Sequence, residues 1–110
     1  MTSTMTKKPV ESYSVYKGIS ELKRIRLSTS IAFDTETLQI PPEKGKLRLI
    51  QLGCNLTNTI VVIDCFDLSL DEWDVLKQFF HSIDRFWLAH NAVFDLGWLQ
   101  EHDIYPKGTV

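Results

Sequence analysis

The chain has 110 residues, of which 44% are hydrophobic, 11% aromatic and 24% charged. This composition excludes an intrinsically disordered or fibrous chain, and the length fits a single small domain. Twelve Lys and Arg against fourteen Asp and Glu give a net charge of −2, so no basic excess indicates a polyanionic partner. Binding to nucleic acid would therefore need a local site or a bound metal.

Signals for targeting and for redox chemistry are few. Cys54 and Cys65 form no CxxC pair, and we interpret both as buried apolar residues in a reducing compartment. The longest apolar run falls well short of the about 18 residues that a membrane span needs, and the polar start lacks the apolar segment of a secretory signal. We expect a cytoplasmic protein with no membrane contact, a disordered lead-in over residues 1–12 and one domain over residues 13–110.

The first elements of this domain are short. Residues 14–16 predict an edge strand, and Ser20 is placed to cap a short helix over residues 21–26. A compact apolar run over residues 30–34 ends in an acid and predicts a buried strand.

Two more strands are expected after a loop. Pro and Gly predict the loop at residues 41–45, and apolar residues alternating with polar ones predict a strand over residues 46–53. After a turn at residues 55–58, β-branched residues predict a third strand over residues 59–64. The short connections favour an antiparallel meander of the three strands.

Two helices are expected on either side of a fourth strand. Ser69 and the Glu three residues later match a capping box, which predicts an amphipathic helix over residues 70–82. Residues 85–90 predict the strand, and residues 92–102 predict a second helix with Asn91 at its N-cap position. The order β-β-β-α-β-α is typical of an α/β domain.

Two groups of acidic residues follow apolar strands. Asp34 and Glu36 are two positions apart, so a strand places both on one side, where a cation would relieve their repulsion. Asn91 and Asp95 share one face of the predicted second helix, with Asp95 among apolar neighbours. Each group alone also fits a common strand end or a helix cap with Asp95 in an exposed turn. Together they favour Mg²⁺ or Mn²⁺, which prefer oxygen ligands, over zinc.

These motifs resemble a known family. Asp34-Thr35-Glu36 after an apolar strand, followed by the segment from His90 to Asp95, is similar to the first two motifs of the DEDD 3′-5′ exonucleases. This superfamily includes ribonuclease D and the proofreading domain of family A DNA polymerases. The resemblance implies a ribonuclease-H-like fold, in which helices surround a mixed five-stranded sheet. It also implies hydrolysis of phosphodiester bonds at the 3′ end of single-stranded DNA or RNA, with two divalent metal ions.

The resemblance implies a role for each matching residue. Asp34 would bridge both metals, Glu36 would hold the first metal and help to place the attacking water, and Asp95 would complete the surroundings of the second. Four more residues are expected along the substrate or behind the metal ligands: Thr37, Leu38, Asn91 and Phe94.

One part of the family pattern has no counterpart. The third motif is a Tyr or His followed four residues later by an Asp, on a helix after the fifth strand, and nothing after Asp95 supplies it. We therefore expect the last strand and helix, and with them a C-terminal half or partner domain, to be missing, and the chain alone to be weakly active or inactive. Two other hypotheses stay open: a non-catalytic nucleic-acid-binding or interaction remnant of the scaffold, and a truncated product with a damaged fold.

Overall fold

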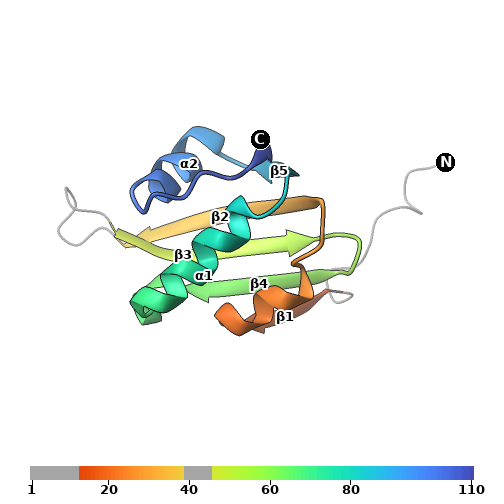
Figure 1. Ribbon diagram of the computed structural model, residues 1–110, viewed down its shortest axis with the longest axis horizontal. Coiled ribbons are helices and arrows are strands. Elements are labelled where there is room, and N and C mark those ends of the chain that lie inside the picture. The colour runs from red at the N-terminus through yellow and green to blue at the C-terminus, as the bar shows by residue number, and fades with distance from the viewer. Residues whose placement is uncertain (1–12, 39–45) are drawn as a thin grey trace.

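The computed structural model describes residues 13–38 and 46–110, which form a mixed sheet with helices beside it (Figure 1). Six strands of the described residues make up the sheet, in the order β1-β4-β3-β2-β5-β6. The strands are β1 (Ser14–Lys17), β2 (Ser30–Leu38), β3 (Lys46–Cys54), β4 (Thr59–Asp64), β5 (Arg85–Ala89) and β6 (Gly108–Thr109). The helices are the 3₁₀ helices η3 (Ile19–Arg24) and η5 (Cys65–Asp67) and the α-helices α1 (Leu70–His81) and α2 (Ala92–Gln100).

The predicted meander is confirmed. β2 pairs antiparallel with β3, and β3 pairs antiparallel with β4, while β1, β5 and β6 are added in parallel. β1 lies at the edge of the sheet, as expected. β2 continues to Leu38, well beyond the predicted end at residue 34, because its alternation of exposed and buried residues continues through the acidic motif. The predicted loop at residues 41–45 and the lead-in at residues 1–12 lie outside the described residues.

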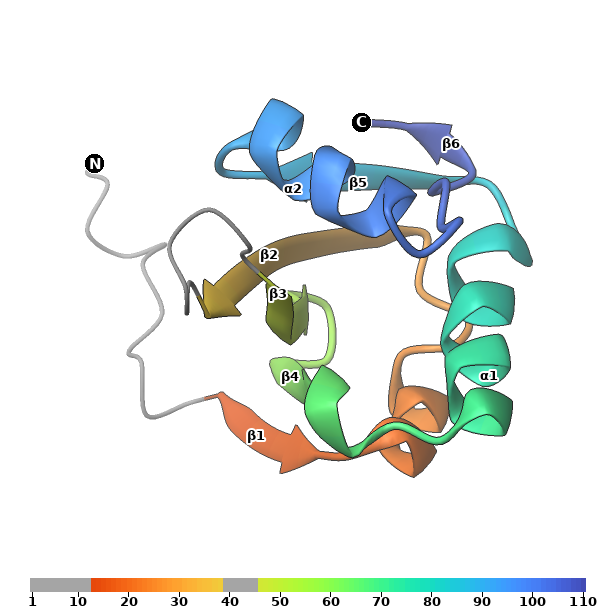
Figure 2. The ribbon, with the colours of Figure 1, turned by 90° about the vertical axis from the view of Figure 1, so that its left-hand side faces the viewer.

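The capping box at the start of α1 is also confirmed. Ser69 Oγ accepts from the Glu72 backbone N–H at 3.2 Å, and Glu72 Oε1 accepts from the Ser69 N–H at 3.0 Å. α1 ends at His81, one residue before its predicted end. Figure 1 shows this helix crossing the sheet, and Figure 2 shows α2 beside β5, at the end of the sheet away from β1.

The cap predicted at Ser20 is wrong, and α2 ends earlier than expected. The first short helix is a 3₁₀ helix that begins at Ile19, because Gly18 makes the turn into it with φ 110°, a conformation that favours glycine. Asn91 stands at the N-cap position of α2 as predicted, but its side chain makes no capping hydrogen bond. α2 ends at Gln100, two residues before the predicted end.

The core lies between α1 and one face of the sheet. Phe80 of α1 stacks on Trp87 of β5, with ring centroids 5.0 Å apart, and meets the ring of Phe33 of β2 edge-on at 6.3 Å. Side chains on the opposite face are exposed, including Phe86 (69%) and Leu88 (72%) of β5. No helix of the described part of the chain is long and apolar enough to cross a membrane.

Arg85, at the start of β5, is buried and donates hydrogen bonds to three backbone carbonyls. Arg85 Nε donates to Ser28 O at 2.7 Å, and its two terminal nitrogens donate to Phe79 O at 2.7 Å and Arg26 O at 2.6 Å. The guanidinium also lies over the ring of Phe79, 4.3 Å from its centre. Burial lowers the pKa of Arg85, and the three carbonyl oxygens compensate its buried charge.

Candidate active site

β2 loses one of its two neighbouring strands part-way along its length. β5 pairs with it only as far as Ala89 opposite Phe33, after which the chain turns into α2. The β2 backbone beyond this point needs other hydrogen-bond partners on that side. The Thr35 backbone N–H donates to two carboxylates, Asp34 Oδ1 at 3.0 Å and Asp95 Oδ1 at 3.3 Å. Two acids from distant parts of the sequence thus share one donor.

Asp95 is buried at the start of α2, with 1% of its surface exposed. The hydroxyl of Thr35 donates to Asp95 Oδ1 at 2.5 Å, but Asp95 Oδ2 is buried without a hydrogen-bond partner. The interpretation of Asp95 as a residue of an exposed turn is therefore wrong. The N-terminus of α2 compensates only part of a buried carboxylate charge, so this position favours a bound cation.

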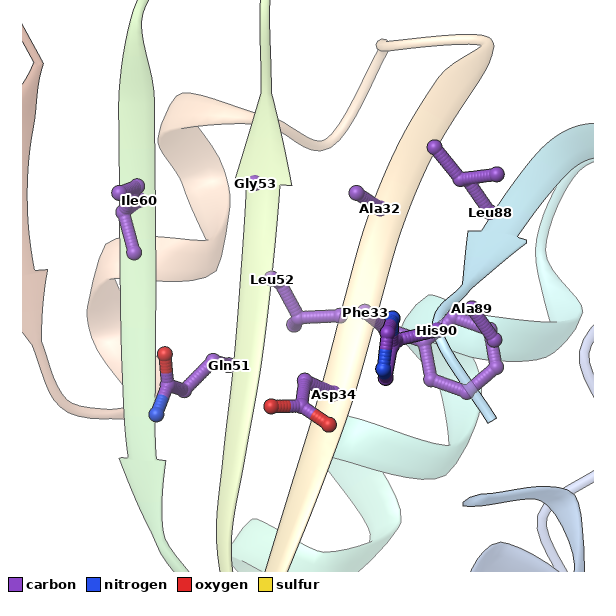
Figure 3. Close-up of a pocket in the computed structure, with 10 residues that line it drawn as sticks. All are labelled: Ala32, Phe33, Asp34, Gln51, Leu52, Gly53, Ile60, Leu88, Ala89 and His90. Carbon is purple, nitrogen blue, oxygen red and sulfur yellow. The ribbon is translucent and has the colours of Figure 1, made fainter. Parts of the chain in front are cut away.

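Asp34 and Glu36 lie on one side of β2, as the alternation predicted, and this side is exposed. Glu36 Oε2 accepts from Gln51 Nε2 at 3.0 Å, and Gln51 stands opposite Asp34 in the register of β2 and β3. A groove of about 550 Å³ lies over the exposed face of the sheet. Asp34, Gln51 and His90 are among the residues that line it (Figure 3). Most of the other residues that line the groove are apolar, Leu88 among them.

The donor atoms fit a divalent cation in their chemistry. Carboxylate oxygens are the usual protein ligands of Mg²⁺ and Mn²⁺, and the unpartnered Asp95 Oδ2 is an oxygen that a cation would stabilise. In residues 13–38 and 46–110, however, no three His, Cys, Asp or Glu side chains are close enough together to hold a metal ion. Asp34 and Asp95 are brought together on one amide, whereas the described contact of Glu36 is with Gln51.

The other four predicted site residues lie on the same two elements. Thr37 and Leu38 end β2, directly after a register irregularity between Glu36 and Thr37. Asn91 and Phe94 lie at the start of α2, where Phe94 is 42% exposed and packs edge-on against Trp98 at 6.3 Å. Each of them is within a few residues of a predicted ligand in the sequence.

Two polar residues that contact the acids were not predicted as site residues. Thr35 is the middle residue of the first motif, and in a strand it points away from its neighbours into the core, where a hydroxyl needs a partner. Gln51 is a polar residue within an otherwise apolar run, on the same face of the sheet as Asp34. A search for polar residues at the buried positions of a strand would have found Thr35, whereas Gln51 follows the alternation of β3 and is found only from its register opposite Asp34.

A family model described as 3′-5′ exonuclease matches residues 14–110. The chain belongs to this family. The match covers both acidic motifs and confirms the resemblance that they carry. No curated protein matches the sequence.

Solved exonuclease structures share the fold. The EXO domain of Nibbler from Aedes aegypti is 22% identical with a TM-score of 0.67, over 84% of this chain and 45% of that one. Trypanosoma brucei RNase D in complex with RNA U12 is 19% identical with a TM-score of 0.68, over 89% and 36%. Escherichia coli RNase D, an exoribonuclease involved in structured RNA processing, is 24% identical with a TM-score of 0.59, over 81% and 24%. These likenesses confirm the predicted exonuclease fold, and the chain spans less than half the length of each.

Proposed function

We propose that this chain carries part of the catalytic site of a metal-dependent 3′-5′ exonuclease. The observation that supports the proposal best is the meeting of Asp34 and Asp95 at one backbone N–H, together with the buried and unpartnered oxygen of Asp95. An acid buried in this way destabilises the fold unless it serves a ligand. Membership of the 3′-5′ exonuclease family favours a divalent metal as that ligand.

In this proposal Asp34, Glu36 and Asp95 hold Mg²⁺ or Mn²⁺, with two ions in a complete site. Such ions, when bound, lower the pKa of an attacking water and stabilise the leaving 3′ oxygen. Asp34 and Glu36 present their oxygens to solvent, where a substrate phosphate can approach, and Asp95 supplies an oxygen from the buried side of β2. Gln51 donates to Glu36 and thereby restricts its carboxylate.

The proposed substrate is the 3′ end of a single-stranded DNA or RNA. A net charge of −2 gives the chain no general attraction for a polyanion, so the metal ions and the local groove would have to provide the binding. We propose that Thr37, Leu38, Asn91 and Phe94 contact the terminal nucleotides, since Phe94 offers an exposed ring. The RNA in the T. brucei RNase D structure supports nucleic acid as the class of substrate.

A nuclease assay tests the proposal. A strand labelled at its 5′ end should shorten stepwise from the 3′ end in Mg²⁺ or Mn²⁺, and EDTA should abolish the shortening. Asp34→Asn should also abolish it, because it removes the charge that faces the groove. Asp74→Asn, an exposed acid on α1, is the matched control and should cleave at the wild-type rate. Full activity in Asp34→Asn would contradict the proposal.

A second candidate is a module that binds nucleic acid or another protein without cleaving it. The absence of any group of three metal-binding side chains in the described residues favours it. It predicts that a labelled single strand is bound but keeps its length even at high Mn²⁺, and that calorimetry detects at most one weak metal site. Two well-occupied metal sites would contradict this candidate.

A further inference from the structure

Thr35 holds one oxygen of Asp95 with two donors. Its hydroxyl donates to Asp95 Oδ1 at 2.5 Å and its backbone N–H donates to the same atom at 3.3 Å. Both side chains are buried, with 5% of Thr35 and 1% of Asp95 exposed, so water does not compete strongly for these bonds. A hydroxyl–carboxylate bond this short belongs to the stronger, charge-assisted class.

The consequence lies at the other oxygen of the same carboxylate. Because Thr35 fixes Oδ1, the orientation of the whole group is fixed, and Oδ2 is left buried with no partner. Among the described residues, Asp95 Oδ2 is the one buried side-chain nitrogen or oxygen atom in this condition. A carboxylate free to rotate would exchange its oxygens or turn toward solvent, so this arrangement depends on Thr35.

We infer that Thr35 is a positioning residue, which holds Asp95 with Oδ1 occupied so that Oδ2 stays available to a divalent cation. The inference rests on the proposed function in that the cation is the metal proposed above. The inference gives a role to Thr35, which lies between Asp34 and Glu36 in the motif. Its side chain points away from both of these acids and into the core. A neutral partner of a metal ligand that sets the ligand's orientation typically contributes about 10- to 100-fold in metal affinity.

Mn²⁺ affinity measured by calorimetry on the full chain tests the inference. Thr35→Ala removes the hydroxyl without adding bulk, whereas Thr35→Val would place a methyl group where a 2.5 Å contact leaves no room for one. We expect Thr35→Ala to weaken Mn²⁺ binding about 10- to 100-fold and Thr35→Ser, which keeps the hydroxyl, to bind within about threefold of the wild type. Thr59→Ala is the matched control and should bind like the wild type, because this buried threonine of β4 donates to Thr57 O instead.

A metal-free measurement separates this inference from the proposed function. Thr35→Ala, Asp95→Asn and the double variant form a cycle in which denaturant midpoints are compared in EDTA. The positioning role predicts that the two substitutions are coupled, with Thr35→Ala costing less once Asp95 is neutral. Additive effects, or wild-type Mn²⁺ affinity in Thr35→Ala, would overturn the inference. A wild-type chain that binds no Mn²⁺ would contradict the proposed metal chemistry, and coupling in the cycle would then still support the hold of Thr35 on Asp95.

Discussion

Two buried charged side chains in this domain, Arg85 and Asp95, differ in how completely they are hydrogen-bonded. On the covered face of the sheet, Arg85 is 2% exposed, and its Nε and both terminal nitrogens each donate to a backbone carbonyl at 2.6 to 2.7 Å. At the edge of β2, Asp95 is 1% exposed, and one of its two oxygens has no partner. Both positions exclude water, so solvent does not explain the difference.

This difference is the one expected between a structural charge and the metal ligand that we propose at Asp95. A charge whose hydrogen bonds are complete within the chain stabilises the fold and needs nothing from outside. A buried charge that lacks some of its hydrogen bonds lowers the stability of the fold. Such a charge is typical of positions that serve a ligand. Substitutions on the covered face should therefore lower stability, whereas neutralising Asp95 should raise it and remove metal binding.

The largest loss is expected from Phe80→Ala. Phe80 is fully buried between Trp87 and Phe33, so the substitution leaves a cavity and should lower the free energy of unfolding by about 3 to 5 kcal/mol. Chemical denaturation followed by tryptophan fluorescence measures this change. Phe86→Ala removes the same ring from the exposed face of β5 and should change stability by no more than about 0.5 kcal/mol. Equal losses in the two variants would contradict the assignment of the covered face.

A somewhat smaller loss is expected from Arg85→Met. Methionine keeps much of the packing against Phe79 but removes the guanidinium donors from three backbone carbonyls, at a cost of about 3 kcal/mol in unfolding free energy. Arg85→Lys keeps the charge but not the planar set of donors, so its loss should be intermediate. Denaturant midpoints compare the two. A methionine variant as stable as the wild type would show that these hydrogen bonds add nothing to stability.

Features that depend on neighbours in the sequence could be predicted. Apolar runs, alternation and β-branched residues located the strands, and the pair of Ser69 and Glu72 located the start of α1. The same local reasoning misplaced the cap of the first short helix at Ser20, because a glycine two residues earlier already makes the turn. It also stopped β2 too early, since an acidic motif suggests a strand end although the strand continues in the ladder with β3.

Features that depend on long-range register could not be predicted in detail. That Asp34 and Asp95 belong together was expected from the two motifs, but their meeting at the Thr35 N–H requires β5 to end opposite Phe33. Arg85 gave no signal of burial, because an arginine at the start of a strand is usually exposed. Its burial follows from where the carbonyls of three separate residues converge.

A gain in stability is expected from Asp95→Asn without metal. The amide keeps a hydrogen-bond acceptor for Thr35 and removes the charge from a site that leaves one oxygen unpartnered. The free energy of unfolding in EDTA should rise by about 1 to 2 kcal/mol, while Mn²⁺ should no longer raise the melting temperature. Asp34→Asn, on the exposed side, should lose metal binding with little change in metal-free stability. A metal-free loss in Asp95→Asn would mean that Asp95 is structural, like Arg85.

The smallest effect concerns the contact between α1 and the turn that follows α2. His102 stacks on Trp73 of α1 with ring centroids 4.2 Å apart, and burial lowers the pKa of His102 below its ordinary value of 6.5, against the smaller opposing effects of Glu101 and Asp103. The unfolded chain therefore takes up the proton first as the pH falls, so this residue's contribution to stability is complete above pH 6.5 and is lost below it.

His102→Phe keeps the stack without the titration, and its denaturant midpoint should fall less than that of the wild type between pH 7 and about pH 5.5. NMR titration of the imidazole gives the pKa directly. A pKa of His102 at or above 6.5 would contradict this account, since it would show that burial does not outweigh the effects of Glu101 and Asp103.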